Sequence, residues 1–383
     1  MPVVIDLFAG VGGLSLGAAR AGFGVQAAIE IDPIALATHA LNFPKTTHLS
    51  DDISTLTGSE LLTKLGMRVG ELDGLIGGPP CQGFSSIGQR RFDDARNSLF
   101  YHFFRLASET QPRFFVAENV PGIMQEKYAS LRQEAFDCVA NDYVILDPIR
   151  AVASEYGAPT TRTRYFFIGI AKSVFLRESE RIQFDFAPAE SIEKITVRKA
   201  LHGLPVRILP DWIEDVQGWR KVNISPELKN TPFFERVVGR VPVNVGHKES
   251  IDKYQKDRLA SGCLGTRHGS EVVLRYNQLE RGKIDPISRS PKLDPNGFCP
   301  TLRAGTGKDR GSYQAVRPIH YLAGRVITPR EAARLQGFPD WFRFHETKWH
   351  SFRQIGNSVC PIVAESILTE IYQKVFAQVE AAD

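Results

Sequence analysis

Val3-Val-Ile-Asp-Leu-Phe-Ala-Gly-Val-Gly-Gly13 is the stretch that sets the fold of this chain of 383 residues. An apolar run enters a glycine-rich turn, and a helical pattern over residues 14–21 follows directly. Glycines in a strand-to-helix turn allow the backbone to approach a ligand closely, although a tight turn with close helix packing needs them too. The order of strand, glycine turn and helix is typical of nucleotide-binding α/β proteins.

Apolar strand-like runs alternate with helical patterns from residue 1 to about residue 172. The runs cover residues 3–7, 25–29, 72–76, 114–117, 143–146 and 165–170, and one of the helical patterns covers residues 99–109. This alternation predicts a doubly wound, mostly parallel sheet with helices on both faces. Open sheets of this kind bind ligands at the carboxyl ends of their strands.

The periodicity weakens between residues 185 and 318, where glycine, proline, asparagine and charged residues are frequent. We therefore expect a first domain over 1–184, a smaller, loop-rich second domain over 185–318, and a return segment over 319–383 that completes the first. Thr328-Pro-Arg-Glu331 predicts a capped helix start, with proline at the first helical position. A last helix is expected from about residue 363 to 379.

The charge is distributed unevenly along the chain. Its formal net value is +4, but residues 190–320 carry 23 Lys and Arg against 15 Asp and Glu. Such a surplus neutralises phosphate groups in nucleic-acid-binding proteins, and it is also compatible with an ordinary solvated face. The five cysteines are scattered without a CxxC pair, and no run of 18 apolar residues occurs, so we expect a cytoplasmic protein with reduced thiols, no metal and no membrane span.

Two acidic positions extend the candidate nucleotide site. Glu30 ends the second predicted strand, about 20 residues after the glycine turn, where a carboxylate binds ribose hydroxyls. Asp51-Asp52-Ile53 offers an acceptor for an adenine amino group. The glycine spacing departs from GxGxxG, with Ser15 at the last position, and no GK[ST] follows. An adenosine compound with a carboxylate instead of a pyrophosphate fits this helix start better.

Pro79-Pro80-Cys81 follows the predicted strand 72–76, between Gly77-Gly78 and Gln82-Gly83. A lone cysteine is most often a small core residue. Here two prolines fix the backbone, and the paired glycines allow a sharp turn at the ligand-binding edge of the sheet. We therefore interpret Cys81 as a thiol aimed at a substrate.

Taken in order, these motifs resemble the DNA cytosine-5 methyltransferases of the prokaryotic restriction-modification type, from Val4 to about Ile367. Glu118-Asn-Val120, Tyr156-Gly-Ala-Pro159 with Arg162-Thr-Arg164, residues 325–340 and Gln354-Ile-Gly-Asn-Ser-Val359 match further signatures of the family. The resemblance implies S-adenosylmethionine as cofactor, bound by a set of residues spread along the chain: Asp6, Phe8, Gly10, Gly12, Gly13, Leu14, Glu30, Ile31, Asp52, Ile53, Pro79, Leu99, Asn357, Ser358 and Val359.

The resemblance also implies the chemistry. Cys81 adds to C6 of a cytosine flipped out of double-stranded DNA, Glu118 acts as an acid toward the base, Arg164 donates to the cytosine O2 and Arg162 supports the same site. Residues 185–318 then form the target-recognition domain. DNA contacts are expected from Ser85, Gln89, Arg90 and Arg91, which equally suit an ordinary surface loop, and from Thr301 and Arg303.

One position departs from the family pattern, because Thr160 follows Tyr-Gly-Ala-Pro where relatives usually have glutamine. Two alternatives stay open. A transfer RNA cytosine-5 methyltransferase uses the same chemistry, but the Cys-Phe-Thr tripeptide of that branch is missing from the sequence. A DNA-binding regulator without catalysis is the other, although Cys81 and Glu118 are both present. We expect a monomer, with a cognate restriction endonuclease acting separately.

Overall fold

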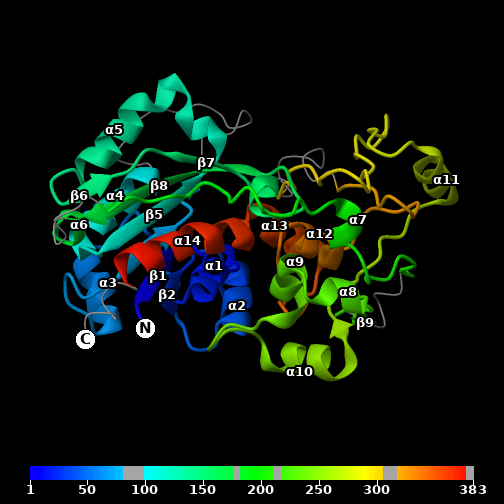
Figure 1. Ribbon diagram of the computed structural model, residues 1–383, viewed down its shortest axis with the longest axis horizontal. Coiled ribbons are helices and arrows are strands. Elements are labelled where there is room, and N and C mark those ends of the chain that lie inside the picture. Colours follow the sequence, from blue (N-terminus) through cyan, green and yellow to red (C-terminus); the bar gives the residue numbers. More distant parts are fainter. Residues whose placement is uncertain (81–98, 176–181, 210–216, 305–316, 377–383) are drawn as a thin grey trace.

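The computed structural model describes residues 1–80, 99–175, 182–209, 217–304 and 317–376. Its centre is an eight-stranded sheet of order β3-β2-β1-β4-β5-β8-β6, with β7 also paired to β8 (Figure 1). The strands are β1 Val3–Leu7, β2 Gly24–Ile29, β3 Thr47–Leu49, β4 Gly74–Gly77, β5 Phe114–Asn119, β6 Tyr143–Ile145, β7 Ile149–Val152 and β8 Thr163–Ala171.

The predicted doubly wound, mostly parallel sheet is confirmed. Strands β1 to β5 pair in parallel, whereas β8 runs antiparallel to β5, β6 and β7. Two strands, β3 and β7, were not among the predicted runs. β3 has only three residues, Thr-His-Leu, and β7 contains Arg150, so neither forms an apolar run that periodicity could detect.

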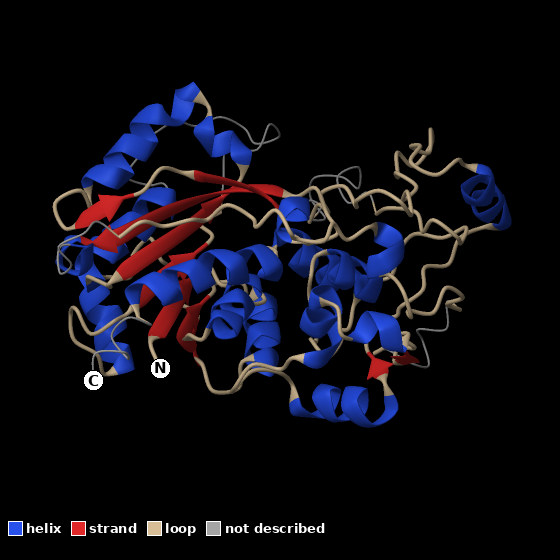
Figure 2. Ribbon diagram, viewed as in Figure 1, coloured by secondary structure: helices blue, strands red, loops and turns tan. Residues whose placement is uncertain are grey.

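Helices cover both faces of the sheet (Figure 2). The principal ones are α1 Gly13–Ala21, α2 Pro33–Asn42, α3 Gly58–Leu65, α4 Leu99–Thr110, α5 Ala129–Asp137 and α14 Pro361–Val375. Alternate residues of β1 enter different cores: Val4 packs in one buried cluster with residues of α1 and α14, while Ile5 and Leu7 pack in the other with α3 and α4. This two-sided burial explains why the strands are apolar throughout.

The C-terminal segment returns to close against the first helix. A β-carbon added to Gly17 of α1 would lie 2.3 Å from the Ala364 Cβ of α14, so glycine is needed for the two helices to touch. The predicted last helix is therefore present as α14, ending at Val375, and residues 377–379 of the prediction lie outside the described residues. Within the described part of the chain, no helix combines the length and apolar character of a membrane span.

The region after residue 184 is built of short elements joined by long loops, on the right of Figure 1. They are α7 Val197–Ala200, β9 Arg220–Lys221, α8 Pro226–Lys229, α9 Pro232–Phe234, the π-helix Glu235–Gly239, α10 Lys248–Asp257, β10 Leu259–Ala260 and α11 Ser270–Gln278. Shorter pieces of the first region are the 3-10 turns Pro121–Met124, Glu126–Tyr128 and Ala153–Tyr156, and α6 Lys172–Phe175.

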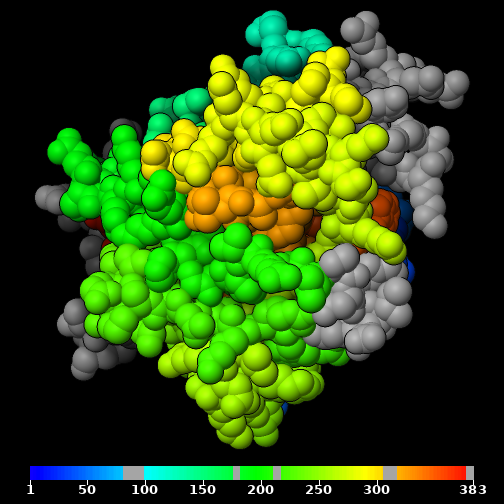
Figure 3. Space-filling model, turned by 90° about the vertical axis from the view of Figure 1, so that its right-hand side faces the viewer, coloured from blue at the N-terminus to red at the C-terminus, as the bar shows by residue number. Residues whose placement is uncertain are grey.

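Helix α12 Pro329–Leu335 starts with the predicted cap: Thr328 accepts from the Glu331 N–H, and the Glu331 carboxylate accepts from the Thr328 N–H. The helix is buried. In Figure 3 the orange part of the chain around it lies between the green and yellow parts of the loop-rich region. Its Arg334 donates to the carbonyls of Ala200 and His202 and pairs with Asp340. Helix α12 thus supports the loop-rich region, and α13 Lys348–Asn357 then leads back to the sheet.

Candidate active site

The carboxyl ends of β1, β4 and β5 meet at one edge of the sheet. Strand β1 lies between β2 and β4, so the chain leaves β1 on one side and returns beside it on the other. This is the topological switch point at which open α/β sheets bind ligands. The turn after β1 takes left-handed backbone conformations at Phe8 (φ 58°), Gly10 (φ 55°) and Gly12 (φ 95°).

Glu30 is held at this edge, directly after β2. Its carboxylate accepts from the backbone N–H of Gly10 (2.9 Å) and of Asp32 (2.8 Å), and burial raises its pKa. The neighbouring Ile31 is 64% exposed, and the space at the α-carbon of Gly10 is open. A fixed carboxylate, an apolar face and an open glycine turn fit the ribose and adenine of an adenosine compound.

The Asp52 loop adjoins the same edge. Asp52 is exposed, and its Oδ1 accepts from the Ser54 N–H and hydroxyl, which lowers the pKa of Asp52. Ile53 is buried. Arg105 of α4 donates to the carbonyls of Ile53 (3.0 Å) and Leu56 (2.8 Å), and so fixes the loop. Nothing in the sequence pattern singled out Arg105, because its partners are backbone carbonyls about 50 residues away.

The return segment completes this edge. A β-carbon on Gly13 would lie 2.3 Å from the Val359 carbonyl oxygen and 3.2 Å from the Ser358 Cβ, so the start of α1 touches the segment after α13 directly. Ser358 and Val359 are buried there, and Asn357 is exposed. Of the other predicted cofactor residues, Leu14 is buried in the core, and Leu99 is half-buried at the start of α4.

Glu118 and Arg164 lie together at the ends of neighbouring strands β5 and β8. Arg164 Nε is 2.8 Å from Glu118 Oε1. The pair is not aligned as a hydrogen bond, and Glu118 Oε1 has no hydrogen-bond partner among the described residues. A β-carbon on Gly78 would be 3.3 Å from Glu118 Oε2, so this carboxylate faces the start of the Pro79-Pro80 turn.

The Glu118 strand also holds that turn. Asn119 Nδ2 donates to the Pro79 carbonyl at 3.3 Å, and β4 and β5 are paired in parallel up to Gly77 and Ala117. Cys81 itself, like Ser85, Gln89, Arg90 and Arg91, lies outside the described residues. The prediction that the strand before Cys81 lies beside the strand that ends in Glu118 is confirmed.

Arg162 has a different position from Arg164. It is 3% exposed, and its guanidinium donates to the carbonyls of Gly356 (2.9 Å) and Asn357 (3.5 Å). Burial, followed by the charge of Arg164, lowers the pKa of Arg162 to about 9. Arg162 therefore joins the residue that precedes β8 to the return segment.

Residues 299–304 run over this part of the site. Thr160 is fully buried and forms a parallel bridge with Cys299, whose N–H donates to the Pro159 carbonyl. A β-carbon on Gly356 would lie 2.6 Å from the Ala304 nitrogen, so this backbone passes directly over the end of α13. Thr301 and Arg303 are exposed on the same stretch. The sequence could not show that the stretch containing both residues passes beside Gly356.

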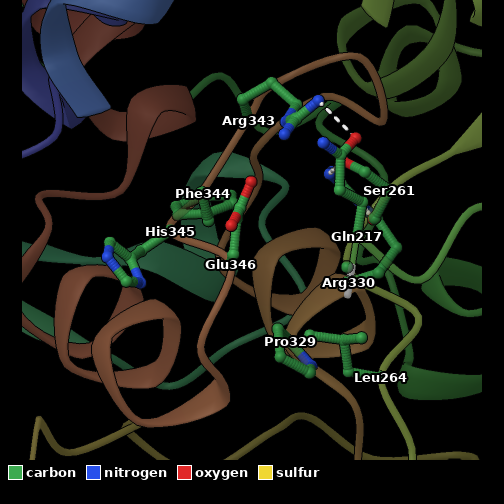
Figure 4. Close-up of a pocket in the computed structure, with 10 residues that line it drawn as sticks. Gln217, Ser261, Leu264, Pro329, Arg330, Arg343, Phe344, His345 and Glu346 are labelled. Carbon is green, nitrogen blue, oxygen red and sulfur yellow. Dashed lines mark hydrogen bonds between the residues drawn. The ribbon is translucent and has the colours of Figure 1, made fainter. Parts of the chain in front are cut away.

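A separate small pocket lies between the loop-rich region and the return segment (Figure 4). Gln217, Arg330, Arg343 and His345 are among its lining residues, and Arg343 donates to Gln217 Oε1 at 3.1 Å. Its internal volume of about 10 Å³ has room for no more than about one water molecule. It is too small for a nucleobase or a cofactor.

The sheet order and the ligand edge define a protein of the S-adenosylmethionine-dependent methyltransferase class. Residues 3–373 match the model of the C-5 cytosine-specific DNA methylase family. The chain belongs to this family, and it is a DNA cytosine-5 methyltransferase.

Relatives and solved structures agree with this assignment. The chain is 40% identical over 372 residues to the type II methyltransferase M.XorII of Xanthomonas oryzae pv. oryzae, covering 96% of this chain and 83% of the relative. It is 33% identical to M.DdeI of Desulfomicrobium norvegicum, over 96% and 88% of the two chains. A crystal structure described as a DNA modification methyltransferase encoded within an E. coli prophage superposes with a TM-score of 0.86 at 55% identity, over 98% and 99% of the chains.

The likeness extends more weakly to another structure. The Dnmt2 methyltransferase of S. pombe superposes with a TM-score of 0.59 at 17% identity, over 97% and 99% of the two chains. That comparison concerns the fold alone.

Proposed function

We propose that the chain transfers a methyl group from S-adenosylmethionine to C5 of a cytosine flipped out of double-stranded DNA, through a covalent bond between Cys81 and C6. The observation that carries this proposal is the convergence at one sheet edge: the Glu30 carboxylate at the glycine turn, the Pro79-Pro80 turn and the Glu118–Arg164 pair lie at the ends of neighbouring strands, and Gly13 and Gly78 both face Val359 of the return segment. S-adenosylmethionine supplies an electrophilic methyl group on a sulfonium.

The protein groups divide the chemistry between them. The Cys81 thiolate forms a bond to C6 and moves electron density toward C5, which makes C5 nucleophilic. Glu118, whose Oε2 faces Gly78 while its Oε1 lies 2.8 Å from Arg164 Nε, donates a hydrogen bond or proton to the ring nitrogen N3 as negative charge develops there. Arg164 donates to the cytosine O2. After methyl transfer, a base removes the C5 proton, the C5–C6 double bond re-forms, and the thiolate leaves.

We assign the cofactor contacts from the positions of the residues at the carboxyl ends of the strands. Glu30 binds the ribose hydroxyls, Ile31 packs on the adenine, Asp52 and Ile53 meet its polar edge, and the turn from Phe8 to Gly13 holds the methionine part. The remaining predicted contacts, Asp6, Leu14, Pro79, Leu99, Asn357, Ser358 and Val359, are assigned to the same cofactor site. Arg162 is assigned a positioning role.

Recognition of DNA is assigned to residues 185–318 as a target-recognition domain, between a catalytic first part (1–184) and the return segment (319–383). Thr301 and Arg303 contact the DNA from the stretch that passes the site, and Ser85, Gln89, Arg90 and Arg91 contact it from the segment after Cys81. We propose that the enzyme acts as a cytoplasmic monomer, in a restriction-modification system with a separately acting endonuclease.

Covalent trapping tests the central step. Duplex DNA with 5-fluorocytosine at the methylated position should become attached to the enzyme when S-adenosylmethionine is present, because fluorine cannot leave as a proton does. The variant C81S should form no adduct while it still binds DNA. Absence of an adduct at a site that the enzyme methylates would falsify the covalent mechanism.

The substrate is tested separately. Methyl transfer from labelled cofactor is measured on duplex DNA and on transfer RNA in parallel. Label is expected in DNA only, and label found only in RNA would overturn the choice of substrate. Bisulfite sequencing of a genome that expresses the chain then identifies the recognised sequence.

A further inference from the structure

A buried chain of hydrogen bonds runs from the glycine turn to the edge strand of the sheet. The Ser15 hydroxyl lies 2.5 Å from Asp6 Oδ2 and 3.0 Å from His39 Nε2. His39 Nδ1 lies 2.9 Å from His48 Nε2 on β3. Asp6, Ser15 and His39 are at most 1% exposed, whereas His48 is half-buried. Four polar side chains thus connect the interior to the surface.

Two residues of this hydrogen-bonded chain, Asp6 and His39, adjoin the glycine turn after β1. Asp6 is the residue of β1 just before the turn, and its Oδ1 is buried without a hydrogen-bond partner among the described residues. The His39 ring packs under Gly12, where an added β-carbon would lie 3.0 Å from His39 Cδ2. Phe43 stacks on the His39 ring at 4.3 Å. The ring therefore has a fixed place beneath the turn.

The hydrogen bonds between these four side chains can all be satisfied in two proton arrangements. A hydroxyl has one proton, so Ser15 donates either to His39 or to Asp6. If Ser15 donates to His39 Nε2, His39 carries its proton on Nδ1 and donates to His48, and Asp6 must be protonated to donate to Ser15. If Ser15 donates to an ionised Asp6, His39 carries its proton on Nε2, and His48 Nε2 must supply the proton between the two rings.

We propose that Asp6, Ser15, His39 and His48 form a proton relay that ties the charge of Asp6, beneath the cofactor turn, to the tautomer of His39. One proton moves along the four groups without a change in bonding elsewhere, and His48 exchanges it with solvent. Ser15, His39 and His48 act through Asp6, so they are positioning residues. The consequence for the cofactor rests on the function proposed above; the relay itself does not.

Few charged groups outside the relay lie close enough to Asp6 to affect its ionisation. Glu30 at the end of β2 is the other carboxylate near Asp6, and Asp32 beyond it is paired with Arg353. Strand β4 contributes only Gly-Leu-Ile-Gly, and Glu365 of α14 is paired with Arg20 at the far end of α1. Burial raises the pKa of Asp6 to about 7 and holds the pKa of His39 well below its usual range. Asp6 therefore titrates near neutral pH while His39 stays neutral and changes tautomer.

Nuclear magnetic resonance of the histidine ring nitrogens in the free enzyme tests the relay without activity. His39 should carry its proton on Nδ1 at pH 6 and on Nε2 at pH 8.5. The midpoint of this tautomer change should coincide with the midpoint of the Asp6 ionisation. Substituting Ser15→Ala should abolish this change. Substituting His48→Leu removes the partner of His39 Nδ1 in both orders, so the midpoint should shift while the tautomer change still depends on Ser15.

A matched control is available in the second region, where Ser250 lies 2.9 Å from His247 Nδ1. Substituting Ser250→Ala removes a buried serine–histidine contact outside the relay, and His39 should titrate as in the wild type. The proposal is overturned if His39 keeps one tautomer from pH 6 to 8.5, or if its tautomer changes equally in the Ser15→Ala variant.

Cofactor affinity supplies a second readout. S-adenosylmethionine carries a sulfonium charge that its product S-adenosylhomocysteine lacks, so ionised Asp6 should favour the former. The ratio of the two Kd values should change several-fold in favour of S-adenosylmethionine between pH 6 and 8 in the wild type, and stay constant in Asp6→Asn. A constant wild-type ratio overturns the link to the cofactor. If neither compound binds at any pH, the proposed function fails, and the resonance experiment still decides the relay.

Discussion

At the scale of single residues, Asp6 is a buried carboxyl group whose ionisation opposes folding. Its pKa is raised by burial from the usual 3.8 to about 7. A group that holds its proton more tightly when folded contributes stability that is complete below pH 3.8 and is lost as the pH rises toward 7. Above that pH the loss amounts to at most about 4 kcal/mol.

Substituting Asp6→Asn should therefore stabilise the cofactor-free protein, and more so at high pH. The gain in unfolding free energy over the wild type should be about 2 kcal/mol larger at pH 8 than at pH 5. Denaturant unfolding at the two pH values measures it. A gain that is equal at both would show that Asp6 ionises in the folded state as it does in water.

A second residue-scale prediction concerns Arg162. Two backbone carbonyls of the return segment accept from its buried guanidinium, and lysine cannot reach both with one ammonium group. Substituting Arg162→Lys should lower turnover at saturating cofactor on the order of 10-fold to 100-fold, because the return segment shifts relative to the ligand-binding edge of the sheet. Arg150, exposed on β7 of the same sheet, provides the control as Arg150→Lys. Wild-type turnover in Arg162→Lys would contradict the positioning role.

At the scale of elements, the close approach of residues 303–304 to the end of α13 depends on Gly356. Alanine suits a helix better than glycine, but its β-carbon would lie 2.6 Å from the Ala304 nitrogen. Gly356→Ala should therefore push the Thr301–Arg303 stretch away and lower methylation of DNA more than it lowers cofactor affinity. Steady-state kinetics and calorimetry measure the two effects. Gly239→Ala, where the added carbon meets open space, should behave as the wild type.

Helix α12 offers a second prediction at this scale. Glu331 is 2% exposed, and both of its oxygens accept from Arg325 at 2.8 Å. Glu331→Gln leaves the Arg325 charge buried without its partner, so the unfolding free energy should fall by about 3 to 5 kcal/mol. Thr328→Ala removes only the helix cap and should cost about 1 kcal/mol. Equal losses in the two variants would show that the ion pair adds nothing beyond the cap.

At the scale of the whole molecule, the basic surplus of residues 190–320 predicts a strong dependence of DNA affinity on salt. If about five phosphates are neutralised, the logarithm of the binding constant should fall with the logarithm of salt concentration with a slope of about −4.5. Arg303→Ala should reduce this slope by about one. Lys172, bonded to the carbonyls of Ala140 and Asn141 at the opposite edge of the sheet, gives the control as Lys172→Ala. A slope unchanged by Arg303→Ala would remove this residue from the DNA interface.

Local patterns predicted most of the sheet and the position of its ligand edge. Apolar runs, glycine turns and helix caps are defined by residues that are close together in the sequence. The strands that end before Glu30, Pro79 and Glu118 were therefore recognised, as was the cap at Thr328. Burial and pairing between distant segments have no local signal. Three features were set by the tertiary structure alone: the pairing of Glu118 with Arg164, the burial of Arg162, and the hydrogen bonds from Asp6 to His48. Each of them arises from the packing of elements that are far apart in the chain. Packing, unlike local propensity, joins residues whatever their spacing in the sequence.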